Sequence, residues 1–292
     1  MGGYFGGLLA KGGADVTFIA RGKHLDALRA KGLTVKSVKG DFSIPVRATD
    51  DPKEVGPVDL ILFCVKSYDT ERAMRQALPM VRKETIVLSL QNGIDNEEEI
   101  AGLVRKEKVL AGVAYIGSSV PEPGVILHEA EGKIAFGELE GGVSDRVLTI
   151  RAFFDRCGLP ADDSPDIRKA LWAKLAWNAP FNAINALVGG TVKAIVENPH
   201  TLELARRVTE EVVAVAVASG VPLAFEEVWQ RNLKFSRRSG IKTSMLQDLE
   251  LGRPLEHEAL NGIVVKYGAG LGIPTPNNFA LYALLSELRR EG

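Results

Sequence analysis

The sequence predicts a two-domain protein, with an α/β domain built on a mostly parallel sheet at residues 1–163 and an all-helical domain at residues 164–292. Two observations lead to this prediction. In the first part, short apolar segments rich in β-branched residues alternate with helical patterns, as in sheets that helices cover on both faces. After Pro160 a polar segment is followed by helical periodicity up to the C-terminus, with hardly any strand pattern.

The elements of the first domain follow from their composition and from the positions of glycines. Glycines end the first two expected helices, and Lys39-Gly40-Asp41 separates two alternating segments, which indicates a hairpin. The expected helices are residues 2–12, 24–31, 70–81 and one that begins at 96. The expected strands are residues 16–20, 33–38, 42–46, 59–65, 85–90 and 109–116, with a further antiparallel pair at 125–127 and 133–136.

The first helix of the second domain, at residues 171–187, carries a polar stripe on an otherwise apolar surface. At about 100° per residue, Lys174, Asn178, Asn182 and Asn185 fall on one side of the helix. A helix that is apolar over most of its circumference is normally buried, so the stripe is expected to face a ligand instead of bulk water. One ammonium and three amides suit a small polar ligand with a carboxylate or a carbonyl group. The other expected helices are residues 201–219, 225–236, 255–271 and 278–290.

Two further points bear on this stripe. Pro180 lies within the helix, where it removes a backbone donor and is expected to kink the helix near the asparagines. The alternative interpretation is a solvated stripe on a surface helix, with the ammonium of Lys174 extending into water. The two tryptophans beside the stripe, Trp172 and Trp177, favour the buried helix.

Composition argues against several classes of function. With a net charge of −1 and 25% charged residues, the chain shows no overall electrostatic attraction to nucleic acid or to an anionic membrane. No apolar run approaches the roughly 20 residues of a membrane span, and the N-terminus lacks the pattern of a signal peptide, so a cytoplasmic protein is expected. Four histidines and two cysteines leave little material for a metal cluster, and no metal site is expected. Cys64 lies in an apolar strand and is expected to be a reduced core residue.

Polar residues follow three of the expected parallel strands, namely Arg21, Lys66 and Asn92. Ligands of open parallel sheets bind at the carboxyl ends of the strands, and dinucleotide-binding domains carry an acidic residue about 20 residues after their glycine-rich turn. Counted from Gly2, that place is taken by Arg21, with Lys23 beside it. A cation there pairs with a 2′-phosphate, so NADP is favoured over NAD. The alternative is an ordinary surface charge at the end of a strand.

One part of a Rossmann-like domain is absent from the expected sheet. Such a domain opens with an apolar strand and a first Gly-x-Gly, whereas this sequence opens at Met1-Gly2, which matches only the end of that fingerprint. The first strand is normally central, so its neighbours would be left with unpaired backbone groups. Either the protein begins upstream of this sequence, or another segment takes the place of the strand.

Taken together, these residues resemble the ketopantoate reductase (2-dehydropantoate 2-reductase) family, over nearly the whole chain. Several short motifs carry the resemblance, and they occur in the right order. The motifs are Gly2-Gly3-Tyr4-Phe5-Gly6-Gly7, Phe18-Ile-Ala-Arg21-Gly22, Val65-Lys66, Leu90-Gln91-Asn92-Gly93, Trp172-Ala-Lys174-Leu-Ala-Trp-Asn178 with Asn182, and Thr243-Ser244-Met245-Leu246-Gln247-Asp248 with Glu256.

The resemblance implies an enzyme that reduces 2-dehydropantoate to (R)-pantoate with NADPH, a step of pantothenate and coenzyme A synthesis. It implies that Lys174 is the general acid and that Glu256 positions this lysine or a substrate hydroxyl. The remaining implied roles concern binding. Asn178, Asn182 and Ser244 are implied to contact the substrate, Asn92 the substrate and the nicotinamide end of the cofactor, Gly2 the cofactor, and Arg21 and Lys66 its 2′-phosphate.

Elementary chemistry agrees with the role of Lys174. Hydride arriving at a ketone carbon builds negative charge on the oxygen, where a cation that can also give a proton is needed. Desolvation lowers the pKa of a lysine and a nearby carboxylate raises it, so the pKa can be tuned. Two alternatives stay open at this point. Glu256 is compatible with a surface charge in the acidic run 256–258, and Ser244 with a helix N-cap that has Gln247 at the capping-box position.

The resulting hypothesis is an NADPH-dependent 2-keto acid reductase whose site lies in the cleft between the two domains. The first alternative is the same reaction on another branched 2-keto acid. The second, from a different class, is a non-catalytic NADP-binding protein, which the absent first strand would favour. The apolar helices of the second domain are also compatible with a homodimer, although periodicity does not separate packing between chains from packing within one.

Overall fold

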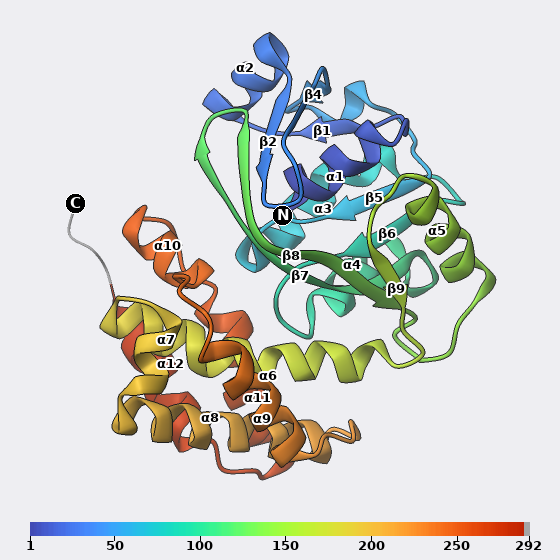
Figure 1. The fold of residues 1–292 in the computed structure, drawn as a ribbon. Coiled ribbons are helices and arrows are strands. Elements are labelled where there is room, and N and C mark those ends of the chain that lie inside the picture. Colours follow the sequence, from blue (N-terminus) through green and yellow to red (C-terminus); the bar gives the residue numbers. More distant parts are fainter. Residues whose placement is uncertain (289–292) are drawn as a thin grey trace. The chain divides into compact units, whose positions relative to one another are not determined.

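Residues 1–288 are described by a computed structural model, and they group into two units (Figure 1). The N-terminal unit consists of Met1–Gln91 and Asn96–Ile167. The helical unit consists of Asn92–Asp95 together with the chain from Arg168 onward. The α/β and all-helical character expected from the sequence is confirmed. The short segment that begins at Asn92 groups with the helices, although it lies far from them in the sequence.

The main sheet of the N-terminal unit has seven strands in the order β3-β2-β8-β7-β6-β5, with β9 paired to β8. Parallel pairs join β5, β6 and β7, and the antiparallel hairpin expected around Gly40 is present as β2 and β3. Thus the sheet is mostly parallel, as expected. The bounds are β2 (Leu33–Ser37), β3 (Phe42–Ile44), β5 (Leu60–Phe63), β6 (Ile86–Ser89), β7 (Val109–Glu122), β8 (Val125–Gly137) and β9 (Ala161–Asp163).

Two further strands form a separate sheet. β1 (Thr17–Ile19) and β4 (Arg47–Thr49) pair in parallel with each other, and β5 is the last strand of the seven-stranded sheet. Within residues 1–288 no strand joins the two sheets. No segment of the described chain takes the place of the absent first strand between β1 and β5.

Two strand predictions are wrong. The segments at 125–127 and 133–136 are not an antiparallel pair but parts of the single strand β8, whose antiparallel partner is β7. The charged residues between them resemble a turn, but they are accommodated by shifts in register and by positive φ angles at Glu131 and Gly132. The polar segment after Pro160 contains β9, which pairs in parallel with β8.

Helix α1 (Gly2–Lys11) is rich in glycine because it packs unusually close to the strands. A Cβ atom added at Gly3 would lie 2.6 Å from the side chain of Ile126 in β8, and one added at Gly6 would lie 2.8 Å from the ring of Phe18 in β1. Helix α1 thereby covers strands of both sheets. The other helices of this unit are α2 (Gly22–Lys31), α3 (Thr70–Ala77), α4 (Asn96–Val104) and α5 (Asp145–Arg156), with 3-10 turns at Pro52–Glu54, Ser67–Asp69, Leu78–Met80 and Lys106–Lys108.

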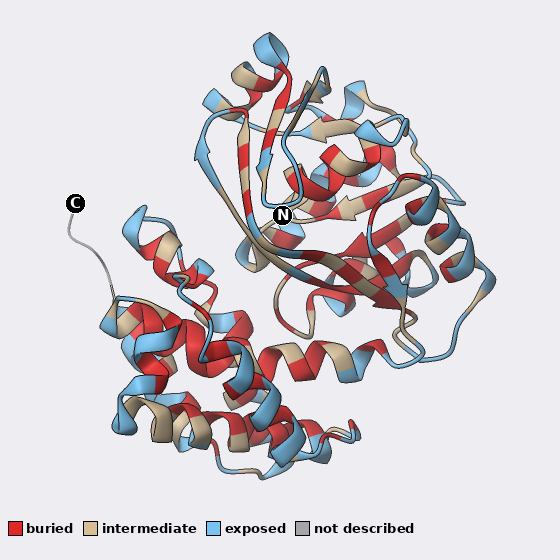
Figure 2. Cartoon of the chain, viewed as in Figure 1, coloured by how far each residue is buried: buried red, intermediate tan, exposed pale blue. Residues whose placement is uncertain are grey.

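The helical unit is centred on α6 (Ile167–Val188), which runs through Pro180 without interruption. Most of its residues are buried (Figure 2), and Trp172, Leu175, Phe181 and Ile184 belong to the core of this unit. No helix within the described residues is long and apolar enough to cross a membrane. The remaining elements are α7 (Val192–Glu197), α8 (Pro199–Ala218), α9 (Phe225–Ser236), α10 (Ser244–Glu250), a π-helix (Glu258–Gly262), α11 (Ile263–Leu271) and α12 (Pro276–Glu287).

The contact between the end of α1 and the end of α5 gives a test of the packing. A Cβ atom added at Gly12 would lie 2.5 Å from the backbone Cα and carbonyl oxygen of Cys157, and backbone atoms cannot rotate away as a side chain would. We expect Gly12→Ala to lower the free energy of unfolding by about 1–3 kcal/mol, measured as a lower urea midpoint. The control is Gly102→Ala, in the exposed face of α4 with nothing near its added Cβ, which should raise stability by up to about 1 kcal/mol. Equal effects of the two substitutions would contradict the packing argument.

Candidate active site

The polar stripe of α6 lies on a helix that is otherwise buried. Asn178, Asn182 and Asn185 are at most 4% exposed, and Lys174 is half-buried. Trp177 stacks on Phe181 with ring centroids 5.4 Å apart. A solvated stripe on a surface helix is therefore wrong, because amides buried to this degree must find partners within the protein or in a ligand.

Three of the predicted site residues meet in the helical unit. Nδ2 of Asn178 donates to Oδ1 of Asn92 over 3.5 Å. Nδ2 of Asn92 in turn donates to Oε2 of Glu256, also over 3.5 Å. Both distances are at the long end of the hydrogen-bonding range. The three side chains thus form a row that runs from α6 through the segment Asn92–Asp95 to Glu256. Glu256 lies two residues before the π-helix.

Lys174 and Glu256 interact electrostatically in this row. Burial lowers the pKa of the Lys174 ammonium to about 8, and the carboxylate of Glu256 opposes this shift by favouring the charged form. Glu256 is only 6% exposed, so the alternative of a surface charge in an acidic run is wrong. A lysine with a pKa near 8 is still mostly protonated at neutral pH, and it can release its proton far more readily than an ordinary lysine.

The remaining asparagines of the stripe have different surroundings. Oδ1 of Asn182 is buried and has no hydrogen-bond partner among the described residues. Asn185 is fully engaged, since its Nδ2 donates to the carbonyl groups of Gly189 and Gly190 and its Oδ1 accepts from the backbone N–H of Thr243. The stripe therefore divides into a structural end at Asn185 and an end at Asn182 that still has an acceptor to offer.

Ser244 is the exposed first residue of α10. The alternative that it caps this helix is wrong, because the cap is Thr243, whose hydroxyl accepts from the backbone N–H of Leu246. Since Asn185 holds the backbone N–H of Thr243, the start of α10 is tied to the end of α6. The predicted contact of Ser244 with substrate remains a prediction.

Three of the four predicted cofactor residues, Gly2, Arg21 and Lys66, belong to the N-terminal unit, whereas Asn92 belongs to the helical unit. Arg21 is exposed just before α2, and its Nη2 donates to Oε1 of Gln76 at 2.9 Å. Lys66 follows β5 and precedes a 3-10 turn, and a Cβ atom added at Gly2 would lie 3.2 Å from Cβ of Cys64. These residues all lie at the ends of strands or at the start of a helix.

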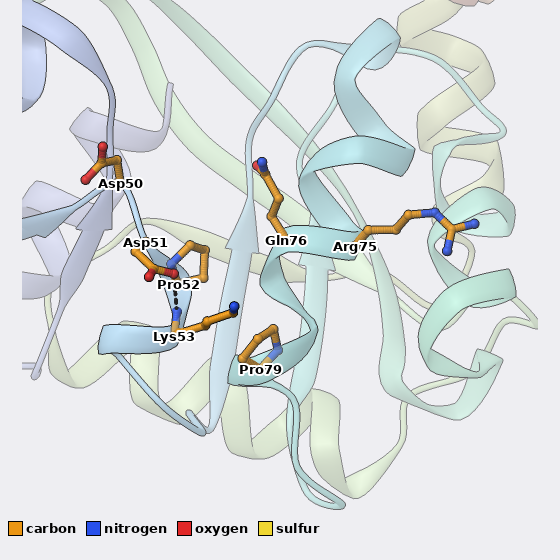
Figure 3. A pocket seen from close by; sticks show the side chains of 7 residues that line it. All are labelled: Asp50, Asp51, Pro52, Lys53, Arg75, Gln76 and Pro79. Atoms are coloured by element: carbon orange, nitrogen blue, oxygen red, sulfur yellow. Dashed lines mark hydrogen bonds between the residues drawn. The ribbon is translucent and has the colours of Figure 1, made fainter.

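A hollow of about 290 Å³ lies beside Arg21. Figure 3 shows it between the turn at residues 50–53 and the chain that carries Gln76 and Pro79. Gln76 both lines this hollow and accepts the hydrogen bond of Arg21. Gln76 was not predicted as a site residue, because a glutamine on an amphipathic helix has no distinguishing pattern in the sequence. The residues that line the hollow are Asp50, Asp51, Pro52, Lys53, Arg75, Gln76 and Pro79.

Comparison with known proteins assigns both parts of the chain to one family. The family model described as "Ketopantoate reductase PanE/ApbA" matches residues 1–141, and the model of the C-terminal domain of the same family matches residues 166–289. The chain belongs to the ketopantoate reductase family. The prediction of the family is thus confirmed, and with it the expected class of pyridine-nucleotide-dependent oxidoreductases.

Individual relatives cover almost the whole chain. A 2-dehydropantoate 2-reductase of Mesorhizobium japonicum is 33% identical over all of this chain and 95% of its own length. The crystal structure of a 2-dehydropantoate 2-reductase from Geobacter metallireducens superimposes with a TM-score of 0.93 at 36% identity, covering 97% of this chain and 95% of that one. A D-mandelate dehydrogenase solved with NADH and anilino(oxo)acetate has a TM-score of 0.92, with 98% and 94% coverage, but at 22% identity it shows only that the fold is shared.

The interaction between Lys174 and Glu256 can be tested without any assay of activity. We expect Glu256→Gln to lower the pKa of the Lys174 amine below its value of about 8, because the carboxylate that favours the charged form is removed. The measurement is the pH dependence of acetylation at Lys174, followed by mass spectrometry. The control is Glu258→Gln, two residues further on and exposed, where the carboxylate accepts from the hydroxyl of Tyr282. An unchanged titration in Glu256→Gln would refute the interaction.

Proposed function

We propose that this chain reduces 2-dehydropantoate to (R)-pantoate with NADPH in pantothenate synthesis, and that Lys174 is the general acid. The observation that carries this proposal is the lysine itself, with a pKa lowered to about 8 beside a buried carboxylate and a row of amides. Perturbed pKa values of this kind are typical of catalytic groups. The names of the relatives support the same reaction.

In the proposed reaction, each of these residues of the helical unit has a separate role. Bound NADPH supplies the hydride. Lys174 first stabilises the negative charge that develops on the substrate oxygen and then gives its proton to that oxygen. Glu256 keeps a sufficient fraction of Lys174 protonated at neutral pH, because it opposes the effect of burial on the pKa. Asn92 and Asn178 supply amide donors and acceptors that orient the substrate.

Asn182 is suited to a substrate hydroxyl. Its Oδ1 is an acceptor that is buried and unused among the described residues, so a ligand that donates a hydrogen bond there would remove a desolvation penalty of about 1–3 kcal/mol. 2-Dehydropantoate carries a hydroxyl group in addition to its ketone and carboxylate. A keto acid without a hydroxyl would leave the amide unpaired, which favours the hydroxylated substrate over other branched 2-keto acids.

The N-terminal unit fits an anionic cofactor with a 2′-phosphate. Arg21 is exposed at the start of α2, and the first turn of this helix contains no acidic residue that would repel an anion. Helix N-termini attract phosphate groups through their free N–H groups and their dipole. We therefore assign NADP(H) as the cofactor, with Arg21 and Lys66 at the 2′-phosphate and Gly2 close to the dinucleotide. The expected cytoplasmic location and the homodimer stay predictions.

Replacement of the lysine tests the general acid directly. We expect Lys174→Met to lower kcat for 2-dehydropantoate by about 10²–10⁴-fold, the usual contribution of a general acid, while NADPH still binds. The control is Lys169→Met, at an exposed position on the same helix, which should keep normal turnover. Near-normal turnover by correctly folded Lys174→Met would refute the role. Tight binding of NADPH by the unmodified chain, with no turnover on any keto acid, would instead support a binding protein.

Cofactor preference tests Arg21. We expect Arg21→Ala to raise KM for NADPH by about 10–150-fold, equivalent to the roughly 1.5–3 kcal/mol of one hydrogen bond to a charged group, and to leave KM for NADH nearly unchanged. Salt should weaken NADPH binding in the native chain, because an exposed ion pair is screened. Lys31→Ala removes a positive charge at the opposite end of α2 and serves as the control. Equal loss with both cofactors would argue against a contact with the 2′-phosphate.

A further inference from the structure

Pro180 removes one backbone hydrogen bond of α6, near the middle of the polar stripe. Because proline has no N–H, the carbonyl group of Ala176 has no helical donor. It accepts instead from Nδ2 of Asn232 at 2.9 Å. The hydroxyl of Thr209 lies 3.3 Å from the same oxygen and shares its proton with the carbonyl group of Ala205, which is closer at 2.8 Å. Both donors are buried, and they come from α9 and α8. Side chains of neighbouring elements therefore satisfy α6 where its own hydrogen bonds fail.

A second donor of this type comes from the segment that follows Glu256. Asn261 is completely buried, and its Nδ2 donates to the carbonyl group of Ala179, next to Pro180, at 3.1 Å. Asn261 lies in the π-helix Glu258–Gly262, which begins two residues after Glu256. Single π-helical turns are rare and are often found at functional sites. Here the turn brings an amide from the Glu256 segment onto the helix that carries Lys174.

The orientation of Asn261 is fixed by a chain of buried polar groups. Its Nδ2 also donates to Oδ1 of Asn278 at 3.1 Å. Asn278 cannot rotate its amide freely, because its backbone N–H and its Nδ2 both donate to Oε2 of Glu211 at 2.8 Å. The carboxylate of Glu211 thus binds Asn278 at the start of α12. Asn278 accepts a hydrogen bond from Asn261, and Asn261 in turn donates to the backbone of α6. Oδ1 of Asn261 has no hydrogen-bond partner among the described residues, so the two contacts of its Nδ2 set its orientation.

We propose that Asn261 is a positioning residue, which fixes the separation of Lys174 and Glu256 by bridging the two segments that carry them. Asn261 lies five residues after Glu256, and Ala179 lies five residues after Lys174, so the hydrogen bond joins the two segments a short way along the chain from each charged residue. The interaction of a carboxylate with an ammonium depends steeply on their separation. This proposal rests on the proposed function, since it assigns Asn261 to the same general acid.

The charged groups around Lys174 define what a loss of Asn261 would change. Glu256 is the carboxylate that favours its protonated form. Arg231 approaches α6 from α9 and donates to the carbonyl group of Ala173, which precedes Lys174 in the chain. If the Glu256 segment relaxes away, Lys174 keeps the unfavourable burial and loses part of its favourable partner. The protonated fraction of Lys174 at neutral pH then falls.

The test compares Asn261→Leu with Asn232→Leu. Each substitution removes one buried amide donor to α6 at similar volume, but Asn232 does not belong to the Glu256 segment, and Thr209 remains on Ala176 in its absence. We expect Asn261→Leu to move the alkaline limb of the kcat–pH profile toward lower pH by about one unit, the low end of the effect of a nearby charge. Asn232→Leu should destabilise the fold without this shift. Asn261→Ser, whose hydroxyl is too short to reach Ala179, should give the same shift if the leucine variant does not fold.

The pH dependence of acetylation at Lys174 separates this proposal from the proposed function, because it requires no turnover. A lower Lys174 pKa in Asn261→Leu or Asn261→Ser supports the positioning role, even if Lys174→Met were to show that the lysine is not the general acid. An unchanged Lys174 pKa in folded variants of Asn261 would overturn the proposal. An equal shift in Asn232→Leu would also overturn it, because any loosening of α6 would then have the same effect.

Discussion

The arrangement of the helical unit depends on holding an ammonium group within a helix surface that is mostly buried. Burial alone would drive Lys174 toward its neutral form, in which it has no proton to give and no charge to offer. Glu256 opposes this effect, and the balance leaves a pKa of about 8. Because both groups lie on separate segments, this balance exists only while the tertiary structure keeps them together. In the proposed reaction, the charge state of the general acid therefore depends on the tertiary structure.

Pro180 explains why so many polar side chains converge on α6. A proline in a helix interior destabilises the helix by about 3 kcal/mol, and it exposes a carbonyl group that cannot be left unpaired in a core. Asn232 and Thr209 satisfy that carbonyl group, and Asn261 adds a donor one turn further on. The carbonyl group of Ala176 therefore becomes an attachment point for α8 and α9, and Asn261 contacts the carbonyl group of Ala179 in addition. A regular helix would have offered no free acceptor at Ala176.

Sequence patterns predicted the parts of this structure that depend on local spacing. The stripe of Lys174, Asn178 and Asn182 follows from helical periodicity, and the hairpin at Gly40 from its turn residues. The continuous strand β8 was missed because its charged middle resembles a turn, and only its pairing with β7 keeps it extended. Asn261 gave no signal, since its importance lies in bonds to residues that are distant in the sequence.

The two kinds of polar group in this chain imply two kinds of recognition. Arg21 is exposed, so its attraction for an anion is weakened by water and by salt. In the proposed contact with the 2′-phosphate, it would shift a preference between related cofactors without making it absolute. Asn178 and Asn182 are buried, so a ligand that fails to pair with them leaves polar atoms stranded in the protein. A buried amide of this kind can reject a wrong substrate by several orders of magnitude, although each hydrogen bond that it makes adds little net affinity. Under the proposed function, substrate discrimination would therefore rest on the asparagines of α6 and on the network that holds that helix in place.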